Sequence, residues 1–78
     1  MKELIELIAQ HLVNDPDGVV VTETQGETAS IIELRVAPDD LGRIIGKQGR
    51  TAKSIRTLVN AAASRQNRKI VLEIIEEK

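Results

Sequence analysis

The sequence predicts an α+β fold of two layers, in which three helices pack on one face of a three-stranded sheet. Three observations support this prediction. Apolar residues recur at helical spacing near the start and in the second half, three short runs are rich in β-branched residues, and glycine or proline separates most of these segments. The expected order is α-β-β-α-α-β, and a length of 78 residues suits one domain over 1–78.

The first expected element is an amphipathic helix over residues 2–13. Its apolar side chains recur at helical spacing, namely Leu4, Ile5, Leu7, Ile8 and Leu12. Glu3 and Glu6 stand in or near the first turn, where the helix dipole favours acidic residues. Residues 14–18, with the sequence Asn-Asp-Pro-Asp-Gly, predict that the helix ends there in a turn.

Two strands are expected after this turn. Residues 19–24 are rich in valine and threonine and predict a strand, and residues 30–36 predict a second one. The short link around Gly26 predicts that the two strands pair as a hairpin. Apolar and charged residues alternate in the second strand, so one face carries Ile32, Leu34 and Val36 and the other carries Glu33 and Arg35.

An interrupted helical segment follows the hairpin. Pro38, Asp39 and Asp40 are typical of a helix start, because proline suits the first turn and acids suit the helix dipole there. The helix can run only to about Ile45, because Gly46 follows.

A longer helix is expected over residues 50–64, after Gly49. Its apolar face is formed by Ile55, Leu58, Val59, Ala62 and Ala63. Residues 70–75 predict the third strand, and residues 76–78 predict a solvated tail.

The four residues Gly46-Lys47-Gln48-Gly49, here called the GxxG loop, separate the two helices. Glycine permits positive φ and allows another backbone to come close. The helix that follows offers backbone N–H groups and the positive end of its dipole to an anion such as phosphate. Lys47 and Arg50 add positive charges at the same place, so the loop is a candidate phosphate-binding site.

Basic residues are concentrated around this loop. The stretch from Leu41 to Lys69 has no acidic residue, although the net charge of the chain is −1. Its eight basic residues are Arg43, Lys47, Arg50, Lys53, Arg56, Arg65, Arg68 and Lys69. A basic helix flank alone is usually only a solvated face, and a lone G-x-x-G often only breaks a helix. Their combination favours a nucleic-acid-binding protein.

The segment Ile44-Ile45-Gly46-Lys47-Gln48-Gly49-Arg50 resembles the I-I-G-x-x-G signature of KH domains. The order α-β-β-α-α-β resembles the type II form of that domain, and the resemblance covers nearly the whole chain. A stand-alone domain of this size is most similar to the KhpA family of small bacterial KH proteins.

This resemblance implies that the GxxG loop clamps the backbone of about four nucleotides of single-stranded RNA, while the bases enter an adjoining groove. The RNA-binding residues that it implies are Arg43, Ile44, Ile45, Gly46, Lys47, Gln48, Gly49, Arg50 and Lys53. The other wall of the groove is expected from the second strand, near residues 32–36. For Ile45 and Ile55, burial in the core is favoured over contact with bases.

The resemblance further implies an RNA chaperone or post-transcriptional regulator, linked in some bacteria to cell-wall synthesis and cell shape. Its partners would be a second copy of the chain or a larger KH-containing protein of the KhpB type. A small core without disulfides is consistent with dimerisation. The small side chains at residues 61–63 would permit close approach of a partner, although they would equally suit packing on the sheet.

Two other functions stay open. A DNA-binding helix-turn-helix also places two helices around a glycine-bearing turn, but its second helix must present base-reading side chains. A protein-interaction adaptor is the other alternative. The chain has no Phe, Tyr or Trp, so it lacks the aromatic stacking that strengthens binding to single strands.

The sequence predicts neither an enzyme nor a cofactor. Cysteine is absent and His11 is the single histidine, which excludes zinc sites built from these residues. The serines have no histidine and acid partner set, and the GxxG loop is too short for a Walker A loop. No apolar run is long enough to span a membrane and the acidic start is not typical of a signal peptide, so we expect a cytoplasmic protein.

Overall fold

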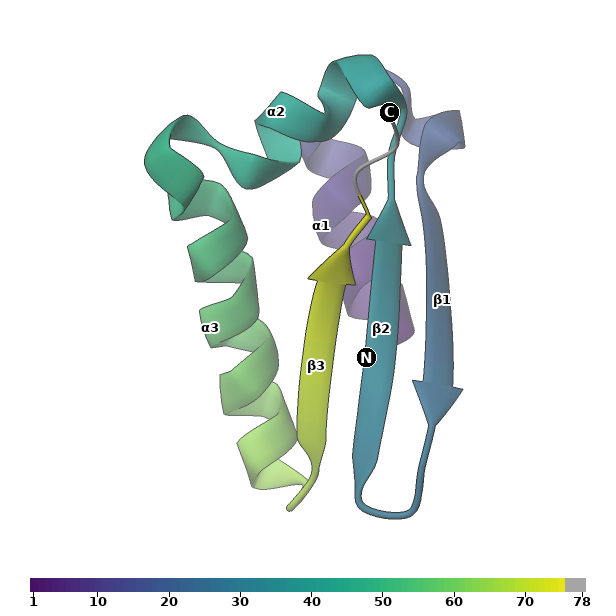
Figure 1. The fold of residues 1–78 in the computed structure, drawn as a ribbon, viewed down its shortest axis with the longest axis vertical. Helices are drawn as coiled ribbons and strands as arrows, with labels where there is room; N and C mark the ends of the chain where they lie inside the picture. The colour runs from purple at the N-terminus through teal and green to yellow at the C-terminus, as the bar shows by residue number, and fades with distance from the viewer. Residues whose placement is uncertain (76–78) are drawn as a thin grey trace.

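The structure is a computed structural model that describes residues 1–75, and it shows the predicted order α-β-β-α-α-β (Figure 1). Its main elements are α1 (Lys2–Leu12), β1 (Val20–Gln25), β2 (Ala29–Arg35), α2 (Leu41–Ile45), α3 (Arg50–Arg65) and β3 (Lys69–Ile74). Short 3₁₀ helices lie between them at η1 (Pro16–Gly18), η2 (Pro38–Asp40) and η3 (Lys47–Gly49). The tail predicted at residues 76–78 lies outside the described residues.

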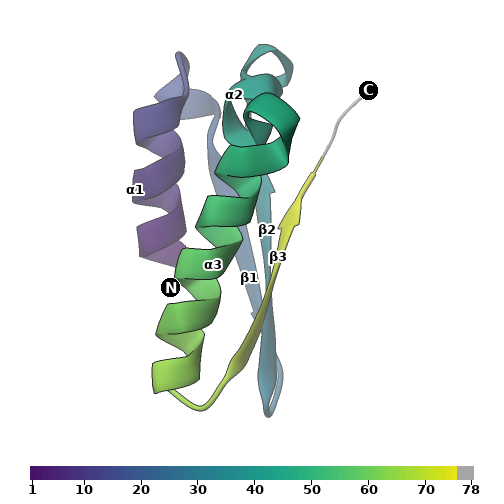
Figure 2. The ribbon, with the colours of Figure 1, turned by 90° about the vertical axis from the view of Figure 1, so that its left-hand side faces the viewer.

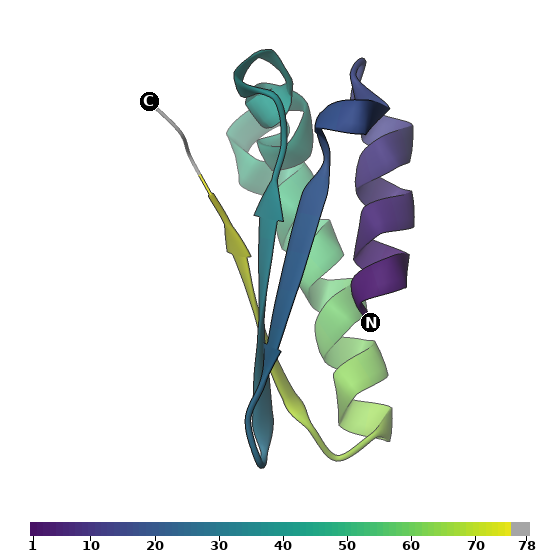
Figure 3. The same ribbon diagram turned by 90° about the vertical axis from the view of Figure 1, so that its right-hand side faces the viewer.

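Strand β2 is the centre of the sheet. It pairs antiparallel with β1 and parallel with β3, and the register places Ile32 beside both Glu23 and Leu72. Helices α1 and α3 cover the same face of the sheet, and no described element covers the other face (Figures 2 and 3). The prediction of a two-layer α+β fold is therefore confirmed.

The core lies between the covered face of the sheet and the helices. Alternation along β2 and the residue that follows it buries Ile32, Leu34 and Val36, each at most 7% exposed, as predicted. The helices contribute Ile5, Ala9, Ile44, Ala52, Ile55, Val59 and Ala63. Ser30 is the polar exception on this face of β2, and its hydroxyl accepts a hydrogen bond of 2.8 Å from the Arg68 guanidinium. That bond offsets the cost of burying a hydroxyl group.

The structure corrects the predicted apolar face of α3. Leu58 is 57% exposed, whereas its neighbour Val59 is fully buried. The buried stripe runs through Ala52, Ile55, Val59 and Ala63, and one residue along a helix turns the side chain by about 100°. A single sheet layer covers only a narrow stripe of the helix, so Leu58 falls outside it. For the same reason Leu4 and Leu7 of α1 are exposed.

Asp40 lies at the predicted helix start, at the end of η2 and directly before α2, but its carboxylate also has a role that the sequence does not predict. Its side chain is 4% exposed and makes no cap hydrogen bond to α2. The carboxylate instead accepts hydrogen bonds from the backbone N–H groups of Asn14 and Asp15, both at 3.1 Å, and from Nε of Arg43 at 3.3 Å. The bond from the Asn14 amide, followed by those from Asp15 and Arg43, lowers the pKa of Asp40. Asp40 therefore ties the end of α1 to the start of α2.

The substitution Asp40→Asn tests this tie. A neutral amide replaces the charged acceptor and brings an NH₂ group towards backbone donors, so we expect the melting temperature at neutral pH to fall by several degrees. Because folding lowers the pKa of Asp40, its stabilisation is present above the unfolded-state value of about 3.9 and is lost as the pH falls through the folded value. Thermal denaturation followed by circular dichroism should show a smaller difference between wild type and variant at pH 3 than at pH 7.

The exposed neighbour Asp39 provides the matched control. Asp39→Asn makes the same chemical change without removing the contacts of Asp40, so its melting temperature should stay close to that of the wild type. Equal losses in the two variants would contradict the role given to Asp40.

Candidate nucleic-acid interface

The GxxG loop is a sharp bend between α2 and α3, built from three residues with positive φ. Gly46 has φ 76°, Gln48 has φ 58° and Gly49 has φ 75°. Two of the three are glycines, for which this region carries no steric penalty. Gln48 is not, and a non-glycine residue held in this conformation is typical of a functional loop. Helix α2 runs across one end of the molecule to the bend, and α3 runs from the bend towards the other end (Figure 1).

Two backbone donors of the loop are free within the described chain. The amides of Gly46, Gly49 and Arg50 donate to the carbonyls of Gly42, Gly46 and Lys47, respectively. The amides of Lys47 and Gln48 have no such partner among the described residues, and both residues are exposed. The amide of Gly49 is already used inside the loop, so the candidate donors for a ligand are the amides of Lys47 and Gln48. They lie next to the N-terminus of α3, whose dipole also favours an anion.

The two glycines of the loop are required for different reasons. A Cβ atom at Gly46 would collide with the side chain and backbone nitrogen of Thr51, in addition to the strain of its positive φ. A Cβ atom at Gly49 would meet nothing within 4 Å, so only its φ of 75° disfavours other residues. Gly46 therefore permits the close contact between the loop and the first turn of α3.

The two isoleucines before the loop are placed differently. Ile44 is fully buried and belongs to the core, so it can shape the site but cannot touch a ligand. Ile45 is only half-buried and lies outside the core cluster, which differs from the expectation that it packs inside. Ile55 is 3% exposed and does take the predicted place in the core.

Most of the basic side chains around the loop are available for a ligand. Arg43 is engaged by Asp40, Arg50 Nη2 lies 3.5 Å from Gln48 Oε1, and Arg68 binds Ser30 and Gly26. The other five of the eight form no side-chain hydrogen bond or ion pair with a described residue, namely Lys47, Lys53, Arg56, Arg65 and Lys69. Since the whole stretch lacks acidic residues, its field attracts a polyanion.

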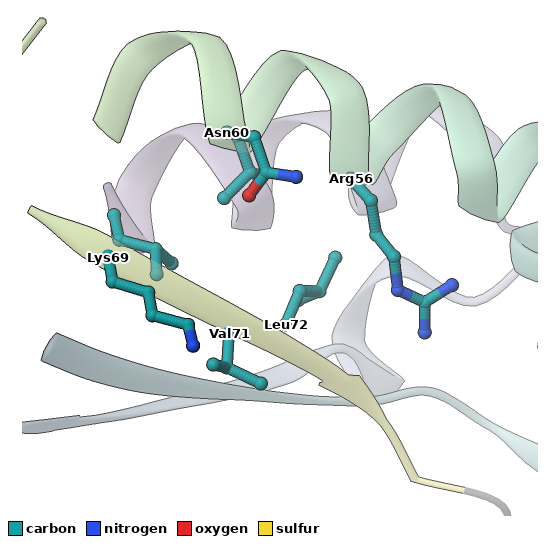
Figure 4. Close-up of a pocket in the computed structure, with 7 residues that line it drawn as sticks. Arg56, Asn60, Lys69, Val71 and Leu72 are labelled. Atoms are coloured by element: carbon teal, nitrogen blue, oxygen red, sulfur yellow. The ribbon is translucent and has the colours of Figure 1, made fainter. Parts of the chain in front are cut away.

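A hollow of about 280 Å³ lies between α3 and β3. Arg56 and Asn60 reach from α3 towards β3, and Lys69 and Leu72 belong to the opposite wall (Figure 4). The groove wall predicted at residues 32–36 does not line this hollow, because β2 is the central strand and its apolar side chains are buried. The edge strand β3 forms the wall instead.

The free edge of β3 adds backbone groups to this hollow. Ile75 donates its N–H to the Leu34 carbonyl at 2.9 Å, and Lys69 donates to the Thr28 carbonyl at 3.2 Å. Odd-numbered residues thus direct their amides towards β2. Alternation along the strand turns the N–H and C=O groups of Ile70 and Leu72 to the free edge, where they face the hollow. They provide donors and acceptors that suit the edge of a nucleotide base.

None of the residues that line the hollow belongs to the sequence-predicted site, and its polar members are Arg56, Asn60 and Lys69. Arg56 and Asn60 are separated by one helical turn, so their shared face was a signal that the sequence carried. Lys69 could not be found in this way, since only the pairing of β3 with β2 brings it beside α3.

The part of the chain that the structure describes has neither a cluster of metal-ligating side chains nor a membrane-spanning helix. His11 Nδ1 lies 2.8 Å from the Leu7 carbonyl oxygen of its own helix. Residues 1–75 contain no group of three or more His, Asp or Glu residues placed to hold a metal ion. In the same range, no helix has the length and apolar character needed to span a membrane.

Comparison with known proteins gives matches along nearly the entire chain. Residues 2–74 match the family model described as the KhpA/KhpB KH domain. RNA-binding protein KhpA of Clostridium perfringens is 57% identical over 75 residues, covering 96% of this chain and 100% of that protein. RNA-binding protein KhpA of Chlamydia trachomatis is 51% identical, covering 100% of both chains, and that of Aquifex aeolicus is 47% identical, covering 97% and 96%. No solved structure matches the chain.

The different surroundings of the two loop glycines predict unequal effects of substitution. Gly49→Ala should lower the free energy of unfolding by about 1 kcal/mol, the cost of a left-handed conformation. Gly46→Ala should cost about 3 kcal/mol or more, because the new methyl group also displaces Thr51. Urea denaturation measures both values. Similar losses at the two positions would show that the contact with Thr51 does not hold the bend.

Proposed function

Because this chain belongs to the KhpA/KhpB family of KH domains, we propose that it binds single-stranded RNA with the GxxG loop and the hollow between α3 and β3. The proposal rests on one observation above all. The amides of Lys47 and Gln48 have no partner in the described chain and lie in an exposed bend beside a free lysine side chain. Such a group of donors suits a phosphate of a nucleic-acid backbone.

In this proposal the loop holds phosphates and the hollow takes bases. Positive charge near the loop comes from Lys47, Arg50 and Lys53. The two glycines, Gly46 and Gly49, allow the protein backbone to come close to the RNA strand. Arg43 is partly occupied by Asp40, so its contribution is smaller. Ile45 offers half-exposed apolar surface next to the bend, while Ile44 supports it from the core.

Bases in the hollow would meet the edge of β3. Hydrogen-bond donors and acceptors there come from the backbone of Ile70 and Leu72 and from the side-chain amide of Asn60. A single strand has unpaired base edges to offer these groups, which a duplex does not. The chain has no aromatic residue for stacking, so we expect modest affinity per domain and modest sequence preference.

The relatives are named RNA-binding proteins, and a role as RNA chaperone or post-transcriptional regulator in the cytoplasm fits that name. We extend the proposal to residues 1–78 acting as one domain, paired with a second copy or with a larger KH-containing protein of the KhpB type. A link to cell-wall synthesis and cell shape follows from the family resemblance alone.

An adaptor function is the second candidate, and exposed apolar side chains favour it. Leu7 is 54% exposed and Leu58 57% exposed, although isolated exposed leucines are common on proteins. A helix-turn-helix is less compatible with the geometry, because the free donors sit at the bend and not along α3.

The double substitution Lys47→Asp with Gln48→Asp tests the proposed function. It places two negative charges beside the free amides, so we expect affinity for short single-stranded RNA to fall at least tenfold while the fold is retained. Aspartate tolerates positive φ, which suits position 48. Fluorescence anisotropy with labelled RNA measures binding, and circular dichroism checks the fold.

A control variant on α1 separates the local effect from the change in net charge. Lys2→Asp with Gln10→Glu changes the net charge by the same amount at exposed positions far along the chain from the loop. This variant should bind RNA nearly as tightly as the wild type. Unchanged binding in the loop variant would support the adaptor, and tighter binding to duplex DNA than to single strands would support the helix-turn-helix.

Salt dependence tests the phosphate contacts directly. Each phosphate that the protein neutralises on a single strand should contribute a slope of roughly −0.7 to the logarithm of the binding constant against the logarithm of salt concentration. With two or three phosphates at the loop, titrations between 50 and 300 mM salt should give a slope of about −1.4 to −2.1. A binding constant independent of salt would rule out this mode of binding.

A further inference from the structure

The groove between α3 and β3 continues into a second hollow of about 460 Å³ at the C-terminal end of α3. Ala63 and Ile70 belong to this hollow, together with the polar residues Asn60, Ser64, Asn67 and Lys69. Asn60, Lys69 and Ile70 also line the first hollow, so the two form one continuous groove. The second hollow is the part of this groove farther from the GxxG loop along α3.

The turn that shapes the second hollow is held firmly in place. Asn67 has φ 53°, and the amides of Asn67 and Arg68 donate to the carbonyls of Ser64 and Ala63 at 3.2 and 3.1 Å. The Arg68 guanidinium donates to Ser30 Oγ and to the Gly26 carbonyl, which ties the turn to the β1–β2 hairpin. A fixed turn costs little further entropy when a ligand binds.

The polar side chains of this hollow are available for a ligand. Those of Ser64, Asn67 and Lys69 make no hydrogen bond or ion pair with a described residue. Together with the positive charge of Arg68, which also lines the hollow, they offer donors to an anion, and the stretch from Leu41 to Lys69 has no acidic residue. This chemistry suits phosphates and ribose hydroxyls.

The length of α3 shows that four nucleotides starting at the GxxG loop do not extend to the far end of the groove at Ser64. The 16 residues of α3 span about 24 Å at 1.5 Å per residue. Four consecutive phosphates at the stacked spacing of about 3.4 Å span only about 10 Å, and about 20 Å if the strand is stretched twofold. A strand that starts at the GxxG loop therefore needs further nucleotides to reach the end of the groove.

We propose that the second hollow binds nucleotides of the same RNA strand beyond the four held by the loop and first hollow. The inference rests on the proposed function and extends it to a footprint of about six to eight nucleotides, with at least two additional phosphates contacted at the end of α3. Charge and polarity of the lining favour nucleic acid over an apolar peptide in this place.

A length series of mixed-sequence single-stranded RNA tests the extension. A longer strand binds a four-nucleotide site more tightly simply because it offers more registers, but extra registers do not change the salt slope. We therefore expect an octamer to show a slope steeper by about 1.4 than a tetramer, because two additional phosphates contribute roughly 0.7 each. Equal slopes for the two lengths would overturn the extension. A tetramer that fails to bind at all would instead count against the proposed function.

Charge changes at position 64 locate the extra contacts. Ser64→Asp should weaken octamer binding at least fivefold and Ser64→Lys should strengthen it, while tetramer binding changes less than twofold in both. Gln10→Asp and Gln10→Lys on α1 repeat the same charge changes away from the groove and should leave both lengths unaffected. Because the two Ser64 variants act in opposite directions, loss of folding cannot imitate the result. Octamer effects no larger at position 64 than at position 10 would overturn the proposal.

Discussion

The interface depends on the backbone conformation of the bend between α2 and α3. Positive φ at Gly46, Gln48 and Gly49 bends the chain sharply within four residues, so the amides of Lys47 and Gln48 take no part in the hydrogen bonds of α2 or α3. A continuous helix would have used both donors for its own hydrogen bonds. The cost is local strain at Gln48 and a strict requirement for glycine at position 46, where a side chain would meet Thr51. Ile44 and Ile55 anchor the two helices in the core on either side of the bend.

The sheet supplies the second half of the interface through its topology. Because β3 pairs parallel to β2, the chain between them must cross over one face of the sheet, and α2, the bend and α3 form that connection. The crossover leaves α3 beside the free edge of β3, and the space between them becomes the groove. Residues that bear charge on α3 and β3 then line one continuous surface, although 13 positions separate Arg56 from Lys69.

Acidic and basic residues occupy different parts of the chain. All acidic residues lie outside the stretch from Leu41 to Lys69, in α1, the turn after it, the hairpin, η2 and the C-terminal part. Asp40 stands at the boundary, where its carboxylate binds two backbone amides and Arg43 and so serves the fold. A net charge near zero thus coexists with a local field strong enough to attract a polyanion.

The sequence by itself determined the order of the elements, the covered face of β2 and the position of the bend. Periodicity and glycine placement are local signals, and each of them acts within a few residues. Tertiary structure alone decided that Leu58 is exposed, that Asp40 holds the end of α1, and that Asn60 and Lys69 share a groove whose wall is β3. These features depend on which strand lies at the edge of the sheet and on how much of each helix surface the sheet can bury. Such long-range contacts leave no periodic trace in the chain, because the partners are distant in sequence and meet only after the sheet has formed.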